Sequence, residues 1–323
     1  MPPRGLHYGL LLSTLLLLGS CVPPSQPFYA GPILGDSVRI YPLPYPVNTP
    51  MHELFPTISR DWKWFYFGRR QNDTTWLYRT AIDSGHAPMI SSAVERFLPD
   101  AATRVYFAAP GRGPREFIVV GCNLPDTRGG CDLYEMELDE GYRFESITNI
   151  TAVNTGYWES TPMLNGSGDQ LWFTQAVDAP FTARYSSVGE LLPDQFDIMI
   201  SIRGPEGWER AKSAGSRINT RFAETSPSLG FNDSVLFFIS DREGGLGASD
   251  VYMSFRGEDG TWGRPQNLGP PINSRYDETS VCILPDNRHL LIASDRPGEG
   301  EPRGVDIYVV ELRYVSSGEE VGD

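Results

Sequence analysis

Lysine is nearly absent from this sequence, which contains only Lys63 and Lys212. Acidic residues outnumber basic residues by 41 to 27, and the formal net charge is −14. A protein that binds nucleic acid needs a basic patch that neutralises phosphates, so this composition argues against nucleic-acid binding. A charge of this size favours solubility in an exposed compartment and carries little information about the fold.

The sequence also lacks an apolar run long enough to cross a membrane as a helix. An apolar segment extends from Leu10 to Leu18. Arg4 is the only lysine or arginine that precedes it. As a helix this segment would reach about 14 Å, whereas a spanning helix needs about 20 residues. A short charged start followed by an apolar core predicts a secretory signal peptide over residues 1–20.

The residues that follow the apolar segment, Leu18-Gly19-Ser20-Cys21, resemble the lipobox of bacterial lipoproteins. This resemblance implies that Cys21 is acylated and becomes the new N-terminus. Residues 21–32 would then be a flexible tether, and the protein would be anchored by lipid in the bacterial cell envelope, on the periplasmic or surface face of an outer membrane. The alternative is an ordinary signal peptide followed by an unrelated cysteine.

Cysteine and histidine are scarce, with four of each in the whole chain. His52, His86 and His289 do not lie near a second cysteine pair, which argues against a zinc site. Cys122 and Cys131 flank a turn-rich stretch, and in an oxidising compartment this spacing suits a disulfide that closes a hairpin. Two free thiols are the alternative.

The sequence shows no long amphipathic helical pattern. It contains 33 glycines, 27 prolines and 12% aromatic residues. This combination indicates many short strands joined by turns.

An internal repeat determines how these strands are organised. In four copies, a β-branched residue, an asparagine and a serine or threonine precede a glutamate: Val47-Asn48-Thr49 with Glu53, Val153-Asn154-Thr155 with Glu159, Ile218-Asn219-Thr220 with Glu224, and Ile272-Asn273-Ser274 with Glu278. Twelve residues after each glutamate an apolar run begins, and an Asp-apolar-Tyr type triplet follows it in most copies. Each unit of roughly fifty residues has the size of a four-stranded propeller blade.

A fifth, degenerate copy lies in the long interval between Glu53 and Glu159, which is about twice the other intervals. Its apolar run is Glu116-Phe117-Ile118-Val119-Val120, its triplet is Asp132-Leu133-Tyr134, and Tyr106 is expected at the position of the acid. This copy lacks the asparagine and the glutamate. The first copy also departs from the pattern, because Trp76-Leu77-Tyr78 replaces its Asp triplet.

The sequence therefore predicts an all-β fold, a five-bladed β-propeller over residues 33–314 with four antiparallel strands per blade. The last unit is one strand short, and residues 37–46 align without gaps with residues 262–271. We therefore expect the N-terminal strand to complete the C-terminal blade, since this closure removes two exposed sheet edges. Residues 315–323 are expected to form a disordered acidic tail.

The two last repeats resemble the TolB-type, WD-like propeller repeats of bacterial envelope proteins. The resemblance rests on residues 238–247 with Asp250-Val251-Tyr252, on residues 293–298 with Asp306-Ile307-Tyr308, and on the turn Leu284-Pro285-Asp286-Asn287. It is strong in blades four and five, fair in blades one and three, and weak in blade two. It implies an envelope protein whose propeller docks a partner.

The recurring acids allow two interpretations. Glu53, Glu159, Glu224 and Glu278 start equivalent inner strands, so they would form either an axial ring that holds a calcium ion or four separate acceptors of backbone N–H groups. Repetition favours the second interpretation. For the same reason we interpret the remaining recurring charges as determinants of the fold: Asp132, Asp197, Asp250 and Asp306, with Asp241-Arg242 and Asp295-Arg296 in the Ser-Asp-Arg turns.

Residues 176–195 form an insertion in blade three that is either a binding loop or a plain surface loop. No nucleophile elbow, P-loop or metal motif is present, and Asp61, Asp73 and Glu209 are isolated candidates for a pair of glycosidase acids. The prediction is a monomeric, non-catalytic binding or scaffold propeller for an envelope protein or a glycan, without catalytic residues, metal or cofactor. The alternative is a glycan-acting five-bladed enzyme.

Overall fold

A computed structural model describes residues 33–34, 38–72, 74–82, 90–98, 105–177, 195–297, 304–312 and 314–315 of the chain. The described residues contain strands and turns, and no helix among them is long and apolar enough to span a membrane. The signal peptide, Cys21, the tether and the acidic tail lie outside these residues and stay predictions. The same holds for nearly all of the blade-three insertion.

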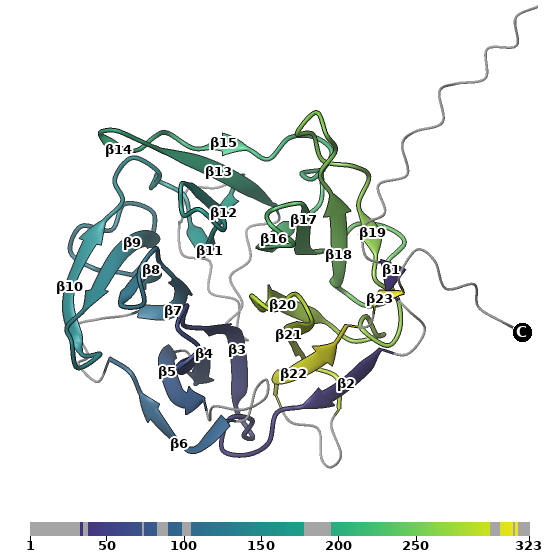
Figure 1. Ribbon diagram of the computed structural model, residues 1–323, viewed down its shortest axis with the longest axis horizontal. Coiled ribbons are helices and arrows are strands. Elements are labelled where there is room, and N and C mark those ends of the chain that lie inside the picture. Colours follow the sequence, from purple (N-terminus) through teal and green to yellow (C-terminus); the bar gives the residue numbers. More distant parts are fainter. Residues whose placement is uncertain are drawn as a thin grey trace, which may run out of the picture. The chain divides into compact units, whose positions relative to one another are not determined.

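Five antiparallel sheets lie around a common centre, which confirms the predicted five-bladed β-propeller (Figure 1). Blade one contains β3 (His52–Ile58), β4 (Trp64–Gln71), β5 (Thr74–Ile82) and β6 (Ile90–Arg96). Blade two contains β7 (Val105–Pro110), β8 (Glu116–Cys122), β9 (Cys131–Leu138) and β10 (Phe144–Asn149). Blade three contains β11 (Glu159–Leu164), β12 (Gln170–Ala176) and β13 (Phe196–Gly204), and its outer position is split into β14 (Gly207–Trp208) and β15 (Lys212–Ser213).

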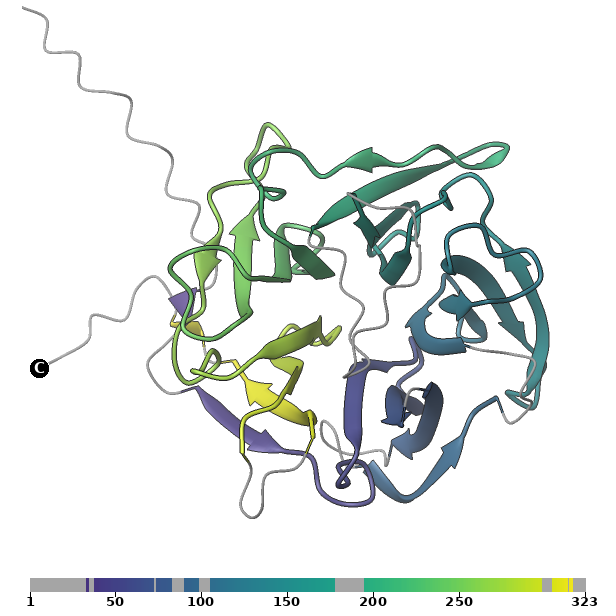
Figure 2. The ribbon, with the colours of Figure 1, turned by 180° about the vertical axis from the view of Figure 1, so that it is seen from behind.

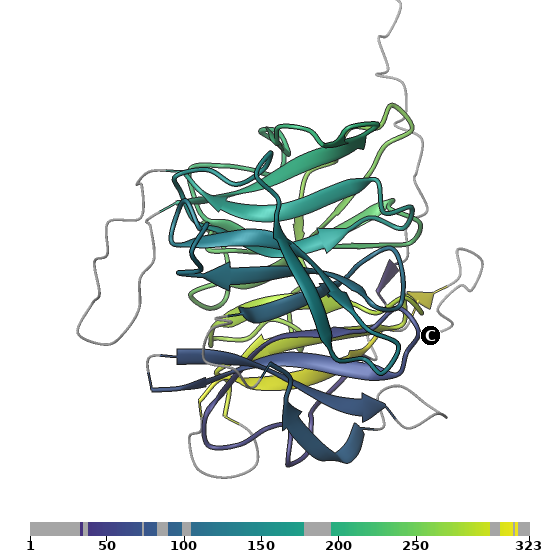
Figure 3. The same ribbon diagram turned by 90° about the vertical axis from the view of Figure 1, so that its left-hand side faces the viewer.

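Blade four contains β16 (Glu224–Gly230), β17 (Val235–Ser240), β18 (Asp250–Phe255) and β19 (Gln266–Asn267). Blade five combines β20 (Glu278–Ile283), β21 (His289–Ser294) and β22 (Asp306–Glu311) with β2 (Arg39–Pro42) from the start of the described chain. The inner strands β3, β7, β11, β16 and β20 surround the centre in both face-on views (Figures 1 and 2). Figure 3 shows the same blades from the side.

The pairing of β2 with β22 confirms that the N-terminal strand closes the ring. Arg39 lies opposite Glu311 and Pro42 lies opposite Tyr308, and Figure 1 shows the purple β2 beside the yellow β22. The predicted alignment with blade four also holds, because Leu43 N–H donates to Ile307 O just as Leu268 N–H donates to Val251 O. A short ribbon of β1 (Ile33–Leu34) and β23 (Tyr314–Val315) joins the two ends of the propeller.

Each interface between neighbouring blades contains one buried apolar cluster. One cluster, for example, combines Val120 and Leu133 of blade two with Leu171 and Phe173 of blade three. Four further clusters occupy the other four interfaces. Because each sheet is covered on both faces, its second strand needs apolar side chains at successive positions, which explains the unbroken runs in the sequence.

The repeated asparagine joins each blade to the one before it. Asn273 accepts a hydrogen bond from Val251 N–H at 2.8 Å and donates one to Val251 O at 2.8 Å. The other three asparagines bind the third strand of the preceding blade in the same two-point manner, namely Asn48 at Ile307, Asn154 at Leu133 and Asn219 at Ile198. The side-chain amide thus acts as one more residue of a β-ladder at each of these joints.

The repeated aspartate shapes the loop that precedes its strand. Asp250 accepts N–H groups of Leu246 and Gly247, and Asp132 accepts those of Arg128 and Gly129. Asp197 and Asp306 occupy the same register, opposite Gln175 and Ser294. The aspartates thus sit where a role in the fold was expected for them.

Candidate axial binding site

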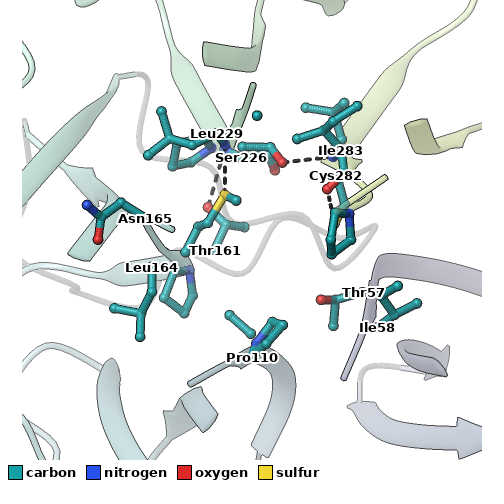
Figure 4. A pocket seen from close by; sticks show the side chains of 18 of the residues that line it. Thr57, Ile58, Pro110, Thr161, Leu164, Asn165, Ser226, Leu229, Cys282 and Ile283 are labelled. Carbon is teal, nitrogen blue, oxygen red and sulfur yellow. Dashed lines mark hydrogen bonds between the residues drawn. The ribbon is translucent and has the colours of Figure 1, made fainter. Parts of the chain in front are cut away.

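A cavity of about 280 Å³ lies on the axis of the propeller and is lined by residues of all five inner strands. Figure 4 shows the labelled side chains around it: Thr57 and Ile58 of β3, Pro110 of β7, Thr161 and Leu164 of β11, Ser226 and Leu229 of β16, and Cys282 and Ile283 of β20. The lining is mainly apolar with a small number of hydroxyl groups, a composition typical of ligand pockets. Its volume lies near the lower end of the usual range, so it suits a small ligand or the end of a longer one.

One equivalent position of the repeat, two residues after the position of the recurring glutamate, contributes a ring of five side chains to the lining. Phe55 and Phe107 occupy it in blades one and two, whereas Thr161, Ser226 and Ser280 occupy it in blades three to five. The two phenylalanine rings lie edge to face with centroids 5.7 Å apart. The ring of side chains therefore has an aromatic half and a hydroxyl half.

Local backbone geometry directs this ring toward the axis. Each inner strand has a register shift at this point, and three of the five residues have positive φ: Phe55 (54°), Thr161 (41°) and Ser226 (50°). These residue types rarely adopt positive φ, and such strain tends to concentrate at functional sites. All three of these strained positions line the cavity.

Several hydroxyl groups of the cavity also link neighbouring blades. Ser280 Oγ accepts Phe55 N–H at 3.2 Å, and Ser228 Oγ accepts Ile283 N–H at 2.9 Å. A hydroxyl that accepts one bond retains a hydrogen to donate and a further lone pair. Ser226 Oγ is buried and has no hydrogen-bond partner within the described part of the chain, so a water molecule or a ligand hydroxyl would stabilise it.

Loops between the first and second strands of the blades form the mouth of the cavity. Arg60, Asn165, Asp233 and Asn287 lie there. Asp233 Oδ1 accepts Gly166 N–H at 2.9 Å, which joins blades four and three. Arg60 donates to Gly111 O at 2.9 Å and so joins blades one and two.

The four repeated glutamates do not line the cavity. All four are 0% exposed, and each binds within its own repeat. Glu53, for example, accepts Thr49 N–H, Thr49 Oγ1–H and Arg69 Nε–H. Among the residues that the structure describes, no group of three or more His, Cys, Asp or Glu side chains is placed to hold a metal ion. The axial acidic ring that the sequence suggested is therefore not formed, because each carboxylate faces its own blade.

The arginine of each Ser-Asp-Arg turn neutralises the glutamate of the same blade. Arg242 Nη2 lies 3.0 Å from Glu224 Oε1, and Arg296 Nη2 lies 2.6 Å from Glu278 Oε1. The aspartates of these turns, Asp241 and Asp295, accept the N–H groups of Ala223 and Asp277. These turns fix the start of the inner strand.

Glu159 differs from the other three glutamates because it has no arginine partner. Its Oε1 accepts Thr155 Oγ1–H at 2.6 Å and Gln175 Nε2–H at 2.8 Å, and its buried Oε2 has no hydrogen-bond partner in the described chain. Burial raises the pKa of Glu159 to about 7, since desolvation disfavours the charged form. Burial also raises the pKa of Glu53, Glu224 and Glu278, against the opposing effect of their hydrogen bonds and arginines.

The isolated glycosidase candidates are not brought together in the axial cavity. Asp61 accepts Tyr142 Oη–H at 2.6 Å between blades one and two, and neither Asp61 nor Glu209 is among the cavity-lining residues. Asp73 lies outside the described residues. Within the described lining, Asp233 at the mouth is the one acidic side chain.

A disulfide joins Cys122 and Cys131 at the end of the β8–β9 ladder, where their Cα atoms lie 4.0 Å apart. The register also corrects one assignment in the same blade. Val105, rather than Tyr106, lies opposite Gly121 and so takes the position of the repeated glutamate. Counting the repeat interval from Glu53 gave the position one residue late.

The sequence did not predict the residues that line the axial cavity. The most important of these are Phe55, Phe107 and Ser226. A signal was present, because the ring position varies between repeats while the glutamate two residues before it recurs. Variation at one position of a repeat marks a place where the blades differ. Such a place can form a site of unlike groups.

No family model matches this chain, and no curated protein matches it by sequence. Among solved structures, a thermostable family-43 glycoside hydrolase superimposes with a TM-score of 0.53 at 9% identity, over 85% of this chain and 94% of that chain. A gluconolactonase from Xanthomonas campestris gives 0.51 at 13% identity, over 87% and 91%. A TolB from Agrobacterium tumefaciens gives 0.42 at 14% identity, over 81% and 74%.

The two similarities with TM-scores above 0.5 support the propeller fold, and they correct the expectation about catalysis. The sequence prediction that the protein is not an enzyme is contradicted, because similar solved structures include glycoside hydrolases and a gluconolactonase. The prediction rested on the equivalence of the repeated acids. That argument fails because the cavity is lined by other residues, whose types differ between blades even at an equivalent position.

Proposed function

We propose that the propeller binds a carbohydrate unit of a glycan in the axial cavity. A sugar ring has an apolar C–H face and a rim of hydroxyl groups, so it needs an aromatic surface on one side and hydrogen-bonding groups on the other. The observation that carries the proposal is the divided ring, with Phe55 and Phe107 in one half and Thr161, Ser226 and Ser280 in the other.

The uncharged wall of the cavity supports a neutral sugar as the bound unit. Its side chains between the two ends are apolar or carry hydroxyl groups, as Thr57, Met163, Ser228 and Cys282 do. A charged group placed there would lose its hydration without gaining an ionic partner.

The experiment is a screen of methyl glycosides of common neutral sugars, methyl β-glucoside among them, followed by titration calorimetry of those that bind. Ser226→Ala removes a buried hydroxyl that has no partner among the described residues, so the fold should be as stable as before or slightly more so. We expect this variant to bind the sugar several-fold more weakly. Phe107→Ala should weaken binding by at least about tenfold, because it removes half of the aromatic surface.

The matched control is Phe144→Ala. Phe144 lies on the outer strand β10, is 41% exposed and does not line the cavity, so its removal should leave sugar binding unchanged. The proposal fails if no neutral glycoside binds. It also fails if Ser226→Ala and Phe107→Ala, both folded, bind the sugar as tightly as the unaltered protein.

A second candidate is that the bound sugar is also a substrate. Asp233 favours it, because this carboxylate stands at the mouth of the cavity beside the sugar's expected position. Hydrolysis of a glycosidic bond generally uses two carboxyl groups that flank the bond. If the protein releases nitrophenol from a nitrophenyl glycoside and Asp233→Asn abolishes this release, the protein is a glycosidase. If the glycoside binds but no nitrophenol is released, the protein binds the sugar without hydrolysing it.

A further inference from the structure

A second, polar cleft of about 550 Å³ lies beside the axial cavity, between loops of blades one to three. Three arginines and three glutamates line it: Arg60, Arg112, Arg203, Glu116, Glu135 and Glu137. The cleft and the axial cavity have Arg60 and Leu164 in common among their lining residues. A ligand that leaves the axial cavity past these two residues therefore enters the polar cleft.

Two of the three arginines are available for an anionic group. Arg203 Nη1 lies 3.3 Å from Glu135 Oε1, which also accepts Trp208 Nε1–H at 3.0 Å, so this pair is internally satisfied. Arg60 donates to carbonyl oxygens of Gly111 and Gly166 and has no carboxylate partner within the described ranges. Arg112 is exposed and forms no salt bridge with any described residue, although its charge, after the hydrogen bonds of Ser167 and Asn165, helps to lower the pKa of Asp169.

Two of the three glutamates are available for a cationic group. Glu116 and Glu137 lie directly opposite each other in the β8–β9 ladder, so their side chains project from the same face of the sheet. Like charges in directly opposed positions destabilise a sheet unless a cation lies between them. No arginine, lysine or histidine of the described chain forms a salt bridge with either of them.

We propose that the polar cleft binds a zwitterionic group that is linked to the sugar in the axial cavity, as in a sugar attached to an amino acid. Arg60 and Arg112 receive the carboxylate, and Glu116 and Glu137 receive the ammonium group. This assignment rests on the proposed function and adds the class of substituent that the glycan carries. A neutral substituent would leave Arg60, Glu116 and Glu137 without ionic partners among the described residues, and a purely acidic one would face the two glutamates.

The test compares four ligands that share the neutral sugar found to bind the axial cavity. They are its methyl glycoside, its O-glycoside of serine, the N-acetylated serine glycoside and the methyl ester of the serine glycoside. The second carries both charges, the third only the carboxylate and the fourth only the ammonium group. We expect the serine glycoside to bind about tenfold more tightly than the methyl glycoside, because charge-assisted hydrogen bonds are the stronger kind. The gain should shrink at high salt, since the cleft is open to solvent.

Two variants separate the two charges. Arg112→Ala should abolish the gain of the N-acetylated ligand, and Glu137→Gln should abolish the gain of the ester. Both residues are exposed, so both variants should fold. Neither should alter the affinity for the methyl glycoside. Arg210→Ala, which removes an exposed arginine outside the cleft, is the matched control and should change nothing.

The outcomes distinguish this inference from the proposed function. If the methyl glycoside binds but the serine glycoside binds no more tightly, or if its gain survives in Arg112→Ala and Glu137→Gln, the zwitterionic subsite is wrong and the axial site stands. If the methyl glycoside does not bind at all, the proposed function is wrong. The serine glycoside then gives no support to the cleft.

Discussion

The joint between blades four and five and the joint between blades one and two hold equivalent sheets together by different means. At the first, Asn273 bonds to both backbone groups of Val251, and Asp250 holds the preceding loop. At the second, Trp76-Leu77-Tyr78 takes the place of the aspartate triplet, and no asparagine of the described chain bonds to Leu77. The backbone bond from Phe97 N–H to Leu77 O remains, and it corresponds to the bond from Leu268 N–H to Val251 O in blade four.

The comparison shows that the repeat is conserved joint by joint rather than blade by blade. In the sequence, the first copy lacks its aspartate triplet and the second copy lacks its asparagine and glutamate, as two unrelated losses. In the structure, the asparagine of one copy binds the residue that follows the aspartate of the copy before it. Both losses therefore lie at the joint between blades one and two. There, neither the aspartate triplet nor the asparagine could form the regular contact without the other.

Side chains specific to blades one and two replace the missing contacts. Tyr142 Oη–H donates to Asp61 at 2.6 Å, and Arg79 Nη1–H donates to Tyr142 O at 2.7 Å. Arg79 also stacks on Trp64, with its guanidinium carbon 4.2 Å from the ring centre. Tyr66 and Phe117 pack edge to face at 5.0 Å. At this joint, aromatic and cationic contacts thus replace the two hydrogen bonds between an asparagine amide and the preceding blade, which we call the amide clamp.

Asn273→Ala should break the regular joint and have the largest effect on stability. The substitution leaves Val251 N–H without a partner in a buried ladder and removes the bonds to Val251 O and Asn267, although Val251 O keeps Leu268 N–H as a donor. An unsatisfied buried backbone N–H costs about 1–3 kcal/mol and each further lost hydrogen bond about 0.5–1.5 kcal/mol, so we expect a loss of about 3–5 kcal/mol in the free energy of unfolding. Urea unfolding followed by tryptophan fluorescence measures it.

The control for this variant is Gln266→Ala on the adjacent β19. Gln266 is exposed and its side chain forms no hydrogen bond with described residues, so its removal should change the free energy of unfolding by less than about 0.5 kcal/mol. A loss below about 1 kcal/mol for Asn273→Ala would show that the amide clamp does not hold the joint.

Glu159→Gln tests the difference between the glutamates that have an arginine partner and Glu159, which has none. Because the pKa of Glu159 is raised to about 7 from an ordinary value of 4.5, the folded state retains a proton that the unfolded chain releases between these values. This contribution to stability is complete below pH 4.5 and is lost as the pH rises through about 7. The neutral glutamine avoids the loss, so at pH 8 the variant should be more stable than the unaltered protein by about 2–4 kcal/mol.

Glu224→Gln is the matched control, because Glu224 differs mainly in having Arg242 as its partner. Removal of its charge leaves a guanidinium with a weaker partner, so this variant should lose stability at pH 8. Free energies of unfolding from pH 5 to pH 8 provide the measurement. Parallel pH curves for the unaltered protein and Glu159→Gln would mean that Glu159 is ionised throughout, contrary to the expectation.

The sequence was sufficient for the blade count and the closure, because both depend on offsets that recur. Asn48, Glu53 and Leu43 occupy the same places as their counterparts in later copies, and an alignment finds them without coordinates. The position of Tyr106 was misjudged because the second copy has no glutamate to anchor its register. Its neighbour Val105 holds that place through strand pairing alone.

The candidate site could not be predicted in the same way. Phe55, Phe107 and Ser226 are alike only in following the glutamate position of their repeat by two residues. Their common direction depends on a register shift in each strand and, for Phe55 and Ser226, on positive φ angles. The polar cleft depends on residues of three blades that approach one another in space, such as Arg60 in a loop of blade one and Arg203 on β13. A repeat pattern predicts what the blades share, whereas a site is formed from what they do not share.

Tyr142→Phe tests the replacement joint with the smallest expected effect. It removes one hydroxyl that bonds to Asp61 and Lys63 while leaving the ring against Trp64 at 6.1 Å. Because Asp61 keeps Ser59 Oγ–H as a donor and the site is partly open to solvent, we expect a loss of about 1 kcal/mol. The hydrogen bonds of Tyr142, Ser59 and Lys63 hold the pKa of Asp61 below its ordinary value despite the opposing effect of burial, so the variant should also titrate Asp61 at higher pH by NMR. No change in that titration would show that the hydroxyl does not support the joint, and that ring packing alone replaces the clamp.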